Sequence, residues 1–191
     1  MEKMFNEFAA YLKEIAPVPR DELERLKAMV TQLTLEKGDR FVDFGQVPDS
    51  LGFLITGMLR YYYVDESGKE FTRYFCNYPG FVSSLTAIVT QSPSAYAIEA
   101  LAQSTLLTFR YMDWLHLMDN HPVWGRITQE VQIRAMLLAE ERERSLLLDD
   151  AQTRYRRFNQ SYPGLEARLK AHQLADYLGM TPETLSRIKK K

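Results

Sequence analysis

The sequence is poor in the residues that build disulfides and metal centres. Cys76 is the only cysteine among 191 residues, which excludes an internal disulfide and an all-cysteine metal or iron–sulfur site within one chain. The three histidines, His116, His121 and His172, lie on or beside predicted helices, whereas a cupin-type metal enzyme needs histidines clustered on strands. No Ser-His-Asp spacing, phosphate loop or metal motif is evident. We therefore expect no enzyme activity, no metal and no cofactor, and we interpret His116 and His121 as structural residues rather than haem ligands.

Long apolar runs and a secretory signal are also missing. No apolar stretch approaches the length that spans a bilayer. The N-terminal MEKMFNEFAAYLKEIA carries acidic residues and an amphipathic period, so it does not resemble a signal peptide. Together with the single cysteine, these features predict a cytoplasmic chain that makes no membrane contact.

Net charge is small, at −1, but its distribution is uneven. From Ala151 to the end there are nine Lys and Arg residues against three Asp and Glu, whereas residues 1–150 hold 15 basic and 22 acidic residues. The basic charge is therefore gathered at the C-terminal end, as expected if that end contacts phosphates.

The N-terminal 120 residues combine helices with short strands. Residues 1–30 have helical periodicity, broken at Pro17 and Pro19. Strand-like pieces separated by turn signals then follow as far as Tyr111: TLEKGDRFV, LGFLITGMLRYYYV, EFTRYFCNY, YAIEAL and TLLTFRY. Short strands at this spacing favour a small all-β sandwich or barrel, and a short helix is predicted over 111–120.

A long helix is predicted over 122–148, where Gly125 is the only glycine and proline occurs only in the first turn. It is apolar on two sides, so it has two surfaces to cover: its own β domain and a second copy of the chain. One stripe, which we assign to the dimer interface, consists of Ile127, Val131, Ala135 and Leu138. The other stripe contains Ile133, Met136 and Leu137. The alternative is a helix buried within one large core.

The stretch 170–191 has the pattern of a helix-turn-helix. Apolar residues recur at i, i+3, i+4 and i+7 up to Leu178, and Gly179 suits a left-handed C-cap. Thr181 is placed to cap a second helix that has Pro182 in its first turn. Such a second helix lies in the DNA major groove, and the alternative is a helical hairpin that only covers a core.

Two stretches carry a resemblance to the Crp/Fnr family of bacterial transcription regulators: LADYLGMTPETLSRI, and LGFLITGMLRYYYVDESGKE, which resembles the paired strands of the cyclic-nucleotide-binding β-roll. The resemblance implies an α+β fold with an N-terminal β-roll of jelly-roll type flanked by helices, a long dimerisation helix and a small all-α helix-turn-helix domain. The corresponding ranges are 1–120, 121–148 and 149–191. It also implies a homodimer that binds a palindromic site on double-stranded DNA and contacts RNA polymerase.

By resemblance, base readout falls to the polar face of the second helix, at Glu183, Ser186 and Arg187. An arginine fork can bond guanine bidentately, and a carboxylate can accept from cytosine. We expect phosphate contacts, which position without specifying sequence, from Thr181, His172, Gln173, Lys189, Lys190 and Lys191. The sequence ends where family members usually continue into a β-hairpin wing, so we expect a wingless short form that also depends on the Arg154–Arg157 helix and on dimer bivalency.

The effector cassette of cyclic-AMP-binding relatives is degenerate here, at Ser83, Ser84, Ser94 and Ala95. Ser84 stands where the family has the ribose-binding glutamate, and Ser94 stands where it has the phosphate-binding arginine. No Arg or Lys occurs between Arg73 and Arg110, and a buried phosphate without a cation is costly. We therefore expect control that is independent of cyclic AMP, by an unknown small-molecule effector or by none. The alternative function is a small-molecule sensor with an apolar β-roll pocket lined by Tyr61, Tyr62, Tyr63, Tyr74, Phe75 and Phe81.

Overall fold

An antiparallel sheet and its covering helices form the first of two units in this computed structural model, which describes residues 1–77 and 79–190. The first unit comprises Met1–Tyr61 and Phe75–Ile133, and the second comprises Tyr62–Tyr74 and the chain from Arg134 onward. The strands are β1 (Thr31–Leu35), β2 (Arg40–Val42), β3 (Ser50–Val64), β4 (Glu70–Cys76), β5 (Gly80–Val82) and β6 (Ala97–Arg110). The sheet order is β1-β6-β3-β4, with β2 paired to β6 and β5 paired to β3.

β6 is one continuous strand of 14 residues, where the sequence predicted two strands separated by a polar break. Ser104 lies in that break and is fully buried. Its hydroxyl accepts from the backbone N–H of Met58 at 3.1 Å and donates to the carbonyl of Ala102 at 2.8 Å. Because both hydrogen-bonding capacities of the hydroxyl are used, the polar residue does not interrupt the strand.

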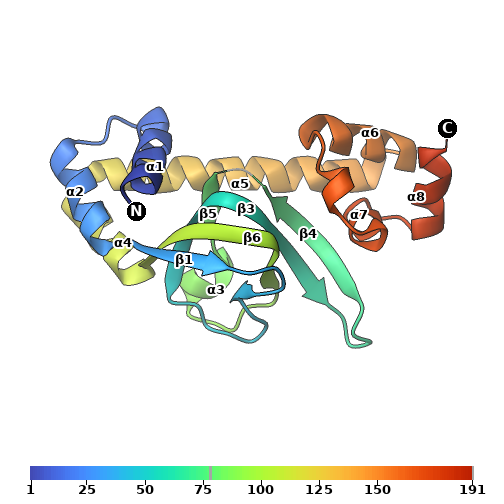
Figure 1. The fold of residues 1–191 in the computed structure, drawn as a ribbon, viewed down its shortest axis with the longest axis horizontal. Coiled ribbons are helices and arrows are strands. Elements are labelled where there is room, and N and C mark those ends of the chain that lie inside the picture. Colours follow the sequence, from blue (N-terminus) through green and yellow to red (C-terminus); the bar gives the residue numbers. More distant parts are fainter. Residues whose placement is uncertain (78, 191) are drawn as a thin grey trace. The chain divides into compact units, whose positions relative to one another are not determined.

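Helices α1 (Glu2–Ile15), α2 (Arg20–Met29) and α4 (Tyr111–Asn120) cover one face of the sheet together with the start of α5 (Pro122–Leu148) (Figure 1). The core between them is rich in aromatic rings, and Phe8 stacks on Phe53 with 4.3 Å between ring centroids. Trp124 of α5 is fully buried and its indole N–H donates to the buried Glu22 carboxylate at 2.7 Å. The long helix therefore begins as part of the first unit's core.

The second unit contains the rest of α5, α6 (Ala151–Ser161), the 3-10 turn η1 (Glu166–Arg168), α7 (Ala171–Tyr177) and α8 (Pro182–Lys189). Its small core includes three rings, in which Phe158 lies 5.3 Å from Tyr162 and 5.5 Å from Tyr177. Arg142 of α5 packs its guanidinium 4.5 Å from the Tyr177 ring and donates to the carbonyls of Arg73 and Thr72. The pKa of Arg142 is lowered by its burial.

The predicted helices 111–120 and 122–148 have the expected bounds, and the helices of residues 1–30 break at the two prolines. Three elements were not predicted. They are β5, the 3-10 turn η1 and the short helix α3 (Leu85–Thr90), which lies inside the degenerate effector cassette.

Candidate nucleic-acid interface and effector site

Helix α8 has one packed side and one open side. Leu185 is buried at 1% exposure and Ile188 is half-buried, whereas Glu183, Ser186 and Arg187 are all exposed. The three candidate readout residues therefore share the solvent side of one helix, because positions three and four apart lie on the same face.

Each of the two charged residues of this face interacts with a threonine hydroxyl. The pKa of the Glu183 carboxyl is lowered first by a hydrogen bond from its own backbone N–H, then by the Thr181 hydroxyl, so the side chain is a carboxylate at neutral pH. Arg187 donates through Nη2 to the Thr184 hydroxyl at 3.2 Å. Among the described residues no ion pair joins Glu183 to Arg187, so both remain available to an outside partner.

The turn before α8 has the predicted chemistry. Gly179 has φ +62°, in the left-handed region that glycine tolerates best, and a Cβ there would lie 2.8 Å from a Leu146 methyl carbon. The Thr181 hydroxyl accepts the Thr184 N–H at 3.2 Å as the N-cap, and Pro182 follows in the first turn. Leu174, Ala175 and Leu178 are buried, so α7 has an apolar side packed within the second unit, and the turn at Gly179 joins it to α8.

The six candidate phosphate residues do not share one environment. Thr181, His172 and Lys190 are exposed. Lys189 forms an ion pair with Glu166 at 2.5 Å, and Glu166 also accepts from Tyr155 Oη at 2.7 Å. Lys191 lies outside the described residues.

The assignment of Gln173 to the phosphate-contacting residues needs correction. Gln173 is only 6% exposed, and its Oε1 accepts the Lys170 N–H at 3.1 Å as part of a capping box. The residue therefore caps α7, and we no longer assign it to phosphate binding.

Two of the three arginines on α6 are engaged within the second unit. Arg154 donates to the carbonyls of Asp149 at 2.6 Å, Leu178 at 2.7 Å and Gly179 at 3.3 Å. Arg157 forms ion pairs with Glu141 at 2.8 Å and Asp149 at 3.1 Å. These two arginines join the hinge to the turn and to α5, so of the three arginines of the helix only Arg156 is left without such bonds among the described residues.

The candidate dimer stripe is divided between two environments. Ile127 is fully buried in the first unit's core, which corrects its assignment to an exposed interface, whereas Val131 packs against that core and is half-buried. Ala135 and Leu138 are exposed. Two residues of the other predicted stripe are also exposed, Met136 at 60% and Leu137 at 55%. Near the end of α5, Leu147 and Leu148 are each 75% exposed.

Two residues of the degenerate effector cassette are hydrogen-bonded to each other. Ser84 and Ser94 are 1% and 4% exposed, and their hydroxyl oxygens lie 2.8 Å apart. Ser94 also donates to the carbonyl of Tyr96 at 2.7 Å, while Ser83 is half-buried and Ala95 is exposed. The Tyr96 ring lies 6.0 Å from Tyr61, so aromatic rings pack beside the serine pair.

The aromatic residues proposed for an apolar pocket do not have a common setting. Tyr61, Tyr62 and Phe75 are buried, Tyr63 is 40% exposed, and Tyr74 is half-buried. Phe81 packs with Phe8, Phe53 and Trp114 in the helix-covered core. This distribution corrects the prediction of one pocket lined by all six residues.

Sequence reasoning overlooked one buried cation of the sheet. Arg60 on β3 is 1% exposed, although the search for a phosphate partner considered only residues between Arg73 and Arg110. Adjacent residues of a strand point to opposite faces, so Arg60 points away from the side on which Tyr61 meets Tyr96. The sequence had placed Arg60 in a strand of the β-roll but did not indicate that its side chain is buried.

Comparisons with known proteins agree with this architecture. Residues 32–121 match the family model described as the cyclic nucleotide-binding domain. FixK2 from Bradyrhizobium japonicum superposes with a TM-score of 0.73 at 15% identity, over 84% of this chain and 83% of that chain. The chain has the fold of the Crp/Fnr regulators.

Other solved Crp/Fnr-type structures agree. The c-di-GMP-responsive global regulator CLP of Xanthomonas campestris gives a TM-score of 0.72 at 16% identity, over 90% of each chain. The catabolite activator protein of Thermus thermophilus gives 0.59 at 16% identity, over 92% of this chain and 84% of that chain. No curated protein has a matching sequence.

The Crp/Fnr fold confirms the predicted α+β class, with its cyclic-nucleotide-binding-type roll and long helix. The solved neighbours are transcription regulators rather than enzymes. Within the described ranges, no helix has the length and apolar character of a membrane span, and no group of three or more His, Cys, Asp or Glu side chains is arranged to hold a metal ion.

Proposed function

We propose that this chain is a sequence-specific DNA-binding transcription regulator that binds a palindromic site as a homodimer. The observation that carries the proposal is α8, a capped helix with Leu185 buried and with Glu183, Ser186 and Arg187 on its open side. Arginine and carboxylate side chains on such a face match the hydrogen-bonding edges of guanine and cytosine in the major groove. RNA polymerase is the further partner expected of such a regulator.

The homodimer is supported by the exposed apolar side chains of α5. Met136, Leu137 and Leu138 are each about half exposed or more, which costs free energy in water and favours burial against a second copy. In a two-fold symmetric dimer the two reading helices would contact half-sites about one DNA turn apart.

Control without cyclic nucleotide is supported by the Ser84–Ser94 pair. Ser84 stands in place of the family's glutamate and Ser94 in place of its arginine, and the two hydroxyls already form a hydrogen bond of 2.8 Å with each other. A cyclic phosphate placed there would lose its hydration without gaining a cation. Isothermal titration with cyclic AMP and cyclic GMP is expected to show no micromolar binding, and a saturable micromolar isotherm would contradict this part of the proposal.

Selection of bound sequences from random duplex DNA tests the central claim, and a palindromic consensus is expected. Two variants then separate readout from positioning. Arg187→Ala should cost roughly 1–3 kcal/mol on the consensus and relax one base position, whereas Lys190→Ala should weaken all sequences alike. Identical specificity profiles for the two variants, or no enrichment by the wild type, would contradict the assigned roles.

A further inference from the structure

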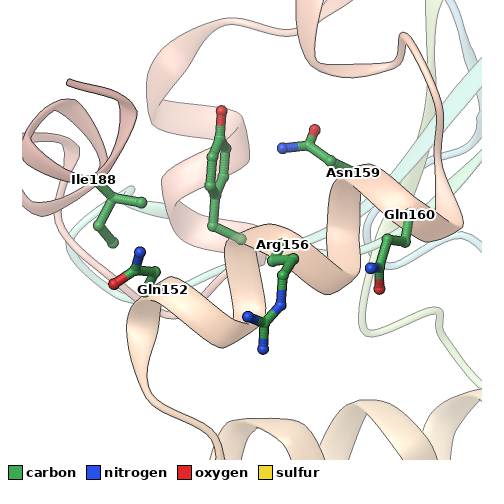
Figure 2. A pocket seen from close by; sticks show the side chains of 6 residues that line it. Gln152, Arg156, Asn159, Gln160 and Ile188 are labelled. Carbon is green, nitrogen blue, oxygen red and sulfur yellow. The ribbon is translucent and has the colours of Figure 1, made fainter. Parts of the chain in front are cut away.

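The exposed side of α6 carries a second row of hydrogen-bond donors beside the reading helix. Gln152, Arg156 and Gln160 recur every four residues, so they lie along one side of the helix, and all three are exposed. With Asn159 and Tyr155 they line a groove whose other wall includes Ile188 of α8 (Figure 2). The row is therefore adjacent to the helix that we propose reads DNA.

These three side chains differ from their neighbours on α6, whose side chains form hydrogen bonds or ion pairs within the second unit. Arg154 and Arg157 are bound to carbonyls and carboxylates, and the Tyr155 hydroxyl is bound to Glu166. Within the described part of the chain, no hydrogen bond or ion pair occupies the side chains of Gln152, Arg156 or Gln160. α6 itself contains no acidic residue, and the carboxylate that interacts electrostatically with Arg156 is that of Asp150, the N-cap of the helix.

We propose that Gln152, Arg156 and Gln160 form a phosphate-binding row that holds the DNA backbone alongside α8. The proposal rests on the DNA-binding function above. An α-helix is about 10–12 Å across and the major groove is about 12 Å wide, so a helix in the groove has a phosphate backbone along each flank. We place α6, which adjoins α8 at Ile188, over one of these backbones, and arginine and glutamine are among the side chains that contact phosphates.

The row differs in role from the α8 face. Phosphates are the same at every base pair, so Arg156 strengthens binding to all sequences and adds no preference. An arginine that neutralises one phosphate releases about one counterion, so affinity falls more steeply with salt. The magnitude of the slope of log affinity against log salt, called the salt slope below, rises by about 0.9. The two glutamines are neutral, so their contribution is independent of salt.

The test measures binding of the full chain to its selected duplex and to a non-specific duplex of the same length, by fluorescence anisotropy over a range of KCl concentrations. Arg156→Ala should reduce the salt slope by about 1 on both duplexes and weaken binding about fivefold near physiological salt. Gln152→Ala should weaken binding with an unchanged slope. Arg156→Lys should restore the slope, because it restores the charge.

Arg20→Ala, at an exposed arginine of the first unit, removes the same net charge and serves as the control, with an unchanged slope expected. If the wild type binds DNA but Arg156→Ala has the wild-type slope and affinity, the row does not face DNA, and a protein partner becomes its occupant. If Arg20→Ala lowers the slope equally, net charge alone explains the effect and the row is refuted. Failure of the wild type to bind either duplex would instead refute the proposed function itself.

Discussion

Arg154 is expected to stabilise the second unit far more than its neighbour Arg156, although both lie on the same helix. Its guanidinium joins the carbonyl of Asp149 at the hinge to those of two adjacent residues nearly thirty positions later, Leu178 at the end of α7 and Gly179 in the turn. Arg154→Ala would remove all three bonds at once. The turn that positions α8 would then lose its connection to the hinge.

The magnitude follows from the geometry. The bonds at 2.6 and 2.7 Å are short and charge-assisted, and a hydrogen bond to a charged group contributes about 1.5–3 kcal/mol. The third, at 3.3 Å, adds little. Because Arg154 is only half-buried, water can reach the freed carbonyls, so the lower end applies to each short bond. We expect a loss of roughly 3 kcal/mol in the free energy of unfolding of the second unit.

Hydrogen exchange at the amides of α7 and α8 measures that free energy directly, because it resolves local opening. Arg156→Ala is the matched control, since it makes the same change in helix propensity and charge at an exposed position, and we expect a change of less than about 0.5 kcal/mol. Equal loss of protection in the two variants would show that the Arg154 bonds do not hold the turn, and the reasoning would be wrong.

Two further predictions concern a glycine and an acidic cap. Gly57→Ala should cost more than about 3 kcal/mol in a urea unfolding curve, because the new Cβ would lie 2.5 Å from the backbone Cα of Ser104 at a residue with φ +115°. Gly68→Ala has φ +82° but open space, so it should cost only about 1–2 kcal/mol, and equal costs would refute the steric argument. The carboxyl pKa of Asp150 is lowered mainly because the carboxylate accepts the Thr153 N–H. The stabilisation by this cap is therefore present above the unfolded pKa of about 4, and it is lost as pH falls through the lower folded pKa. Asp150→Asn keeps a cap and removes this titration, so its acid unfolding curve should be less steep than that of the wild type, and an unchanged curve would contradict the assignment.

The features that the sequence predicted best are those that depend only on residues close to one another in the chain. Thr181 as a cap, Pro182 in the first turn and Gly179 in the left-handed region follow from local backbone chemistry, and the structure has all three. The bounds of α5 also follow locally, from the absence of interior proline between Pro122 and Leu148.

Features that depend on tertiary packing were predicted less well. Helical periodicity placed Ile127 on an apolar stripe but did not indicate that the chain's own core buries it. The sequence placed Arg154 on a helix expected to support DNA binding, whereas its guanidinium donates to the carbonyls of Asp149, Leu178 and Gly179. The prediction that Gln173 contacts phosphate was wrong for the same reason, because its capping role depends on where the chain enters α7.

The self-satisfied serine pair of the roll has a consequence for how such a regulator responds to its surroundings. A ligand entering between Ser84 and Ser94 must first break their 2.8 Å hydrogen bond, and it meets neutral hydroxyls rather than a charged receptor. An anionic ligand at this place would therefore gain no ion pair with either serine, and it could shift the conformation only by as much as its affinities for two states differ. Under the proposed function, occupancy of the DNA site would follow the amount of chain that the cell makes, through the equilibrium between single chains and dimers, and transcription of its own gene would be the natural point of control.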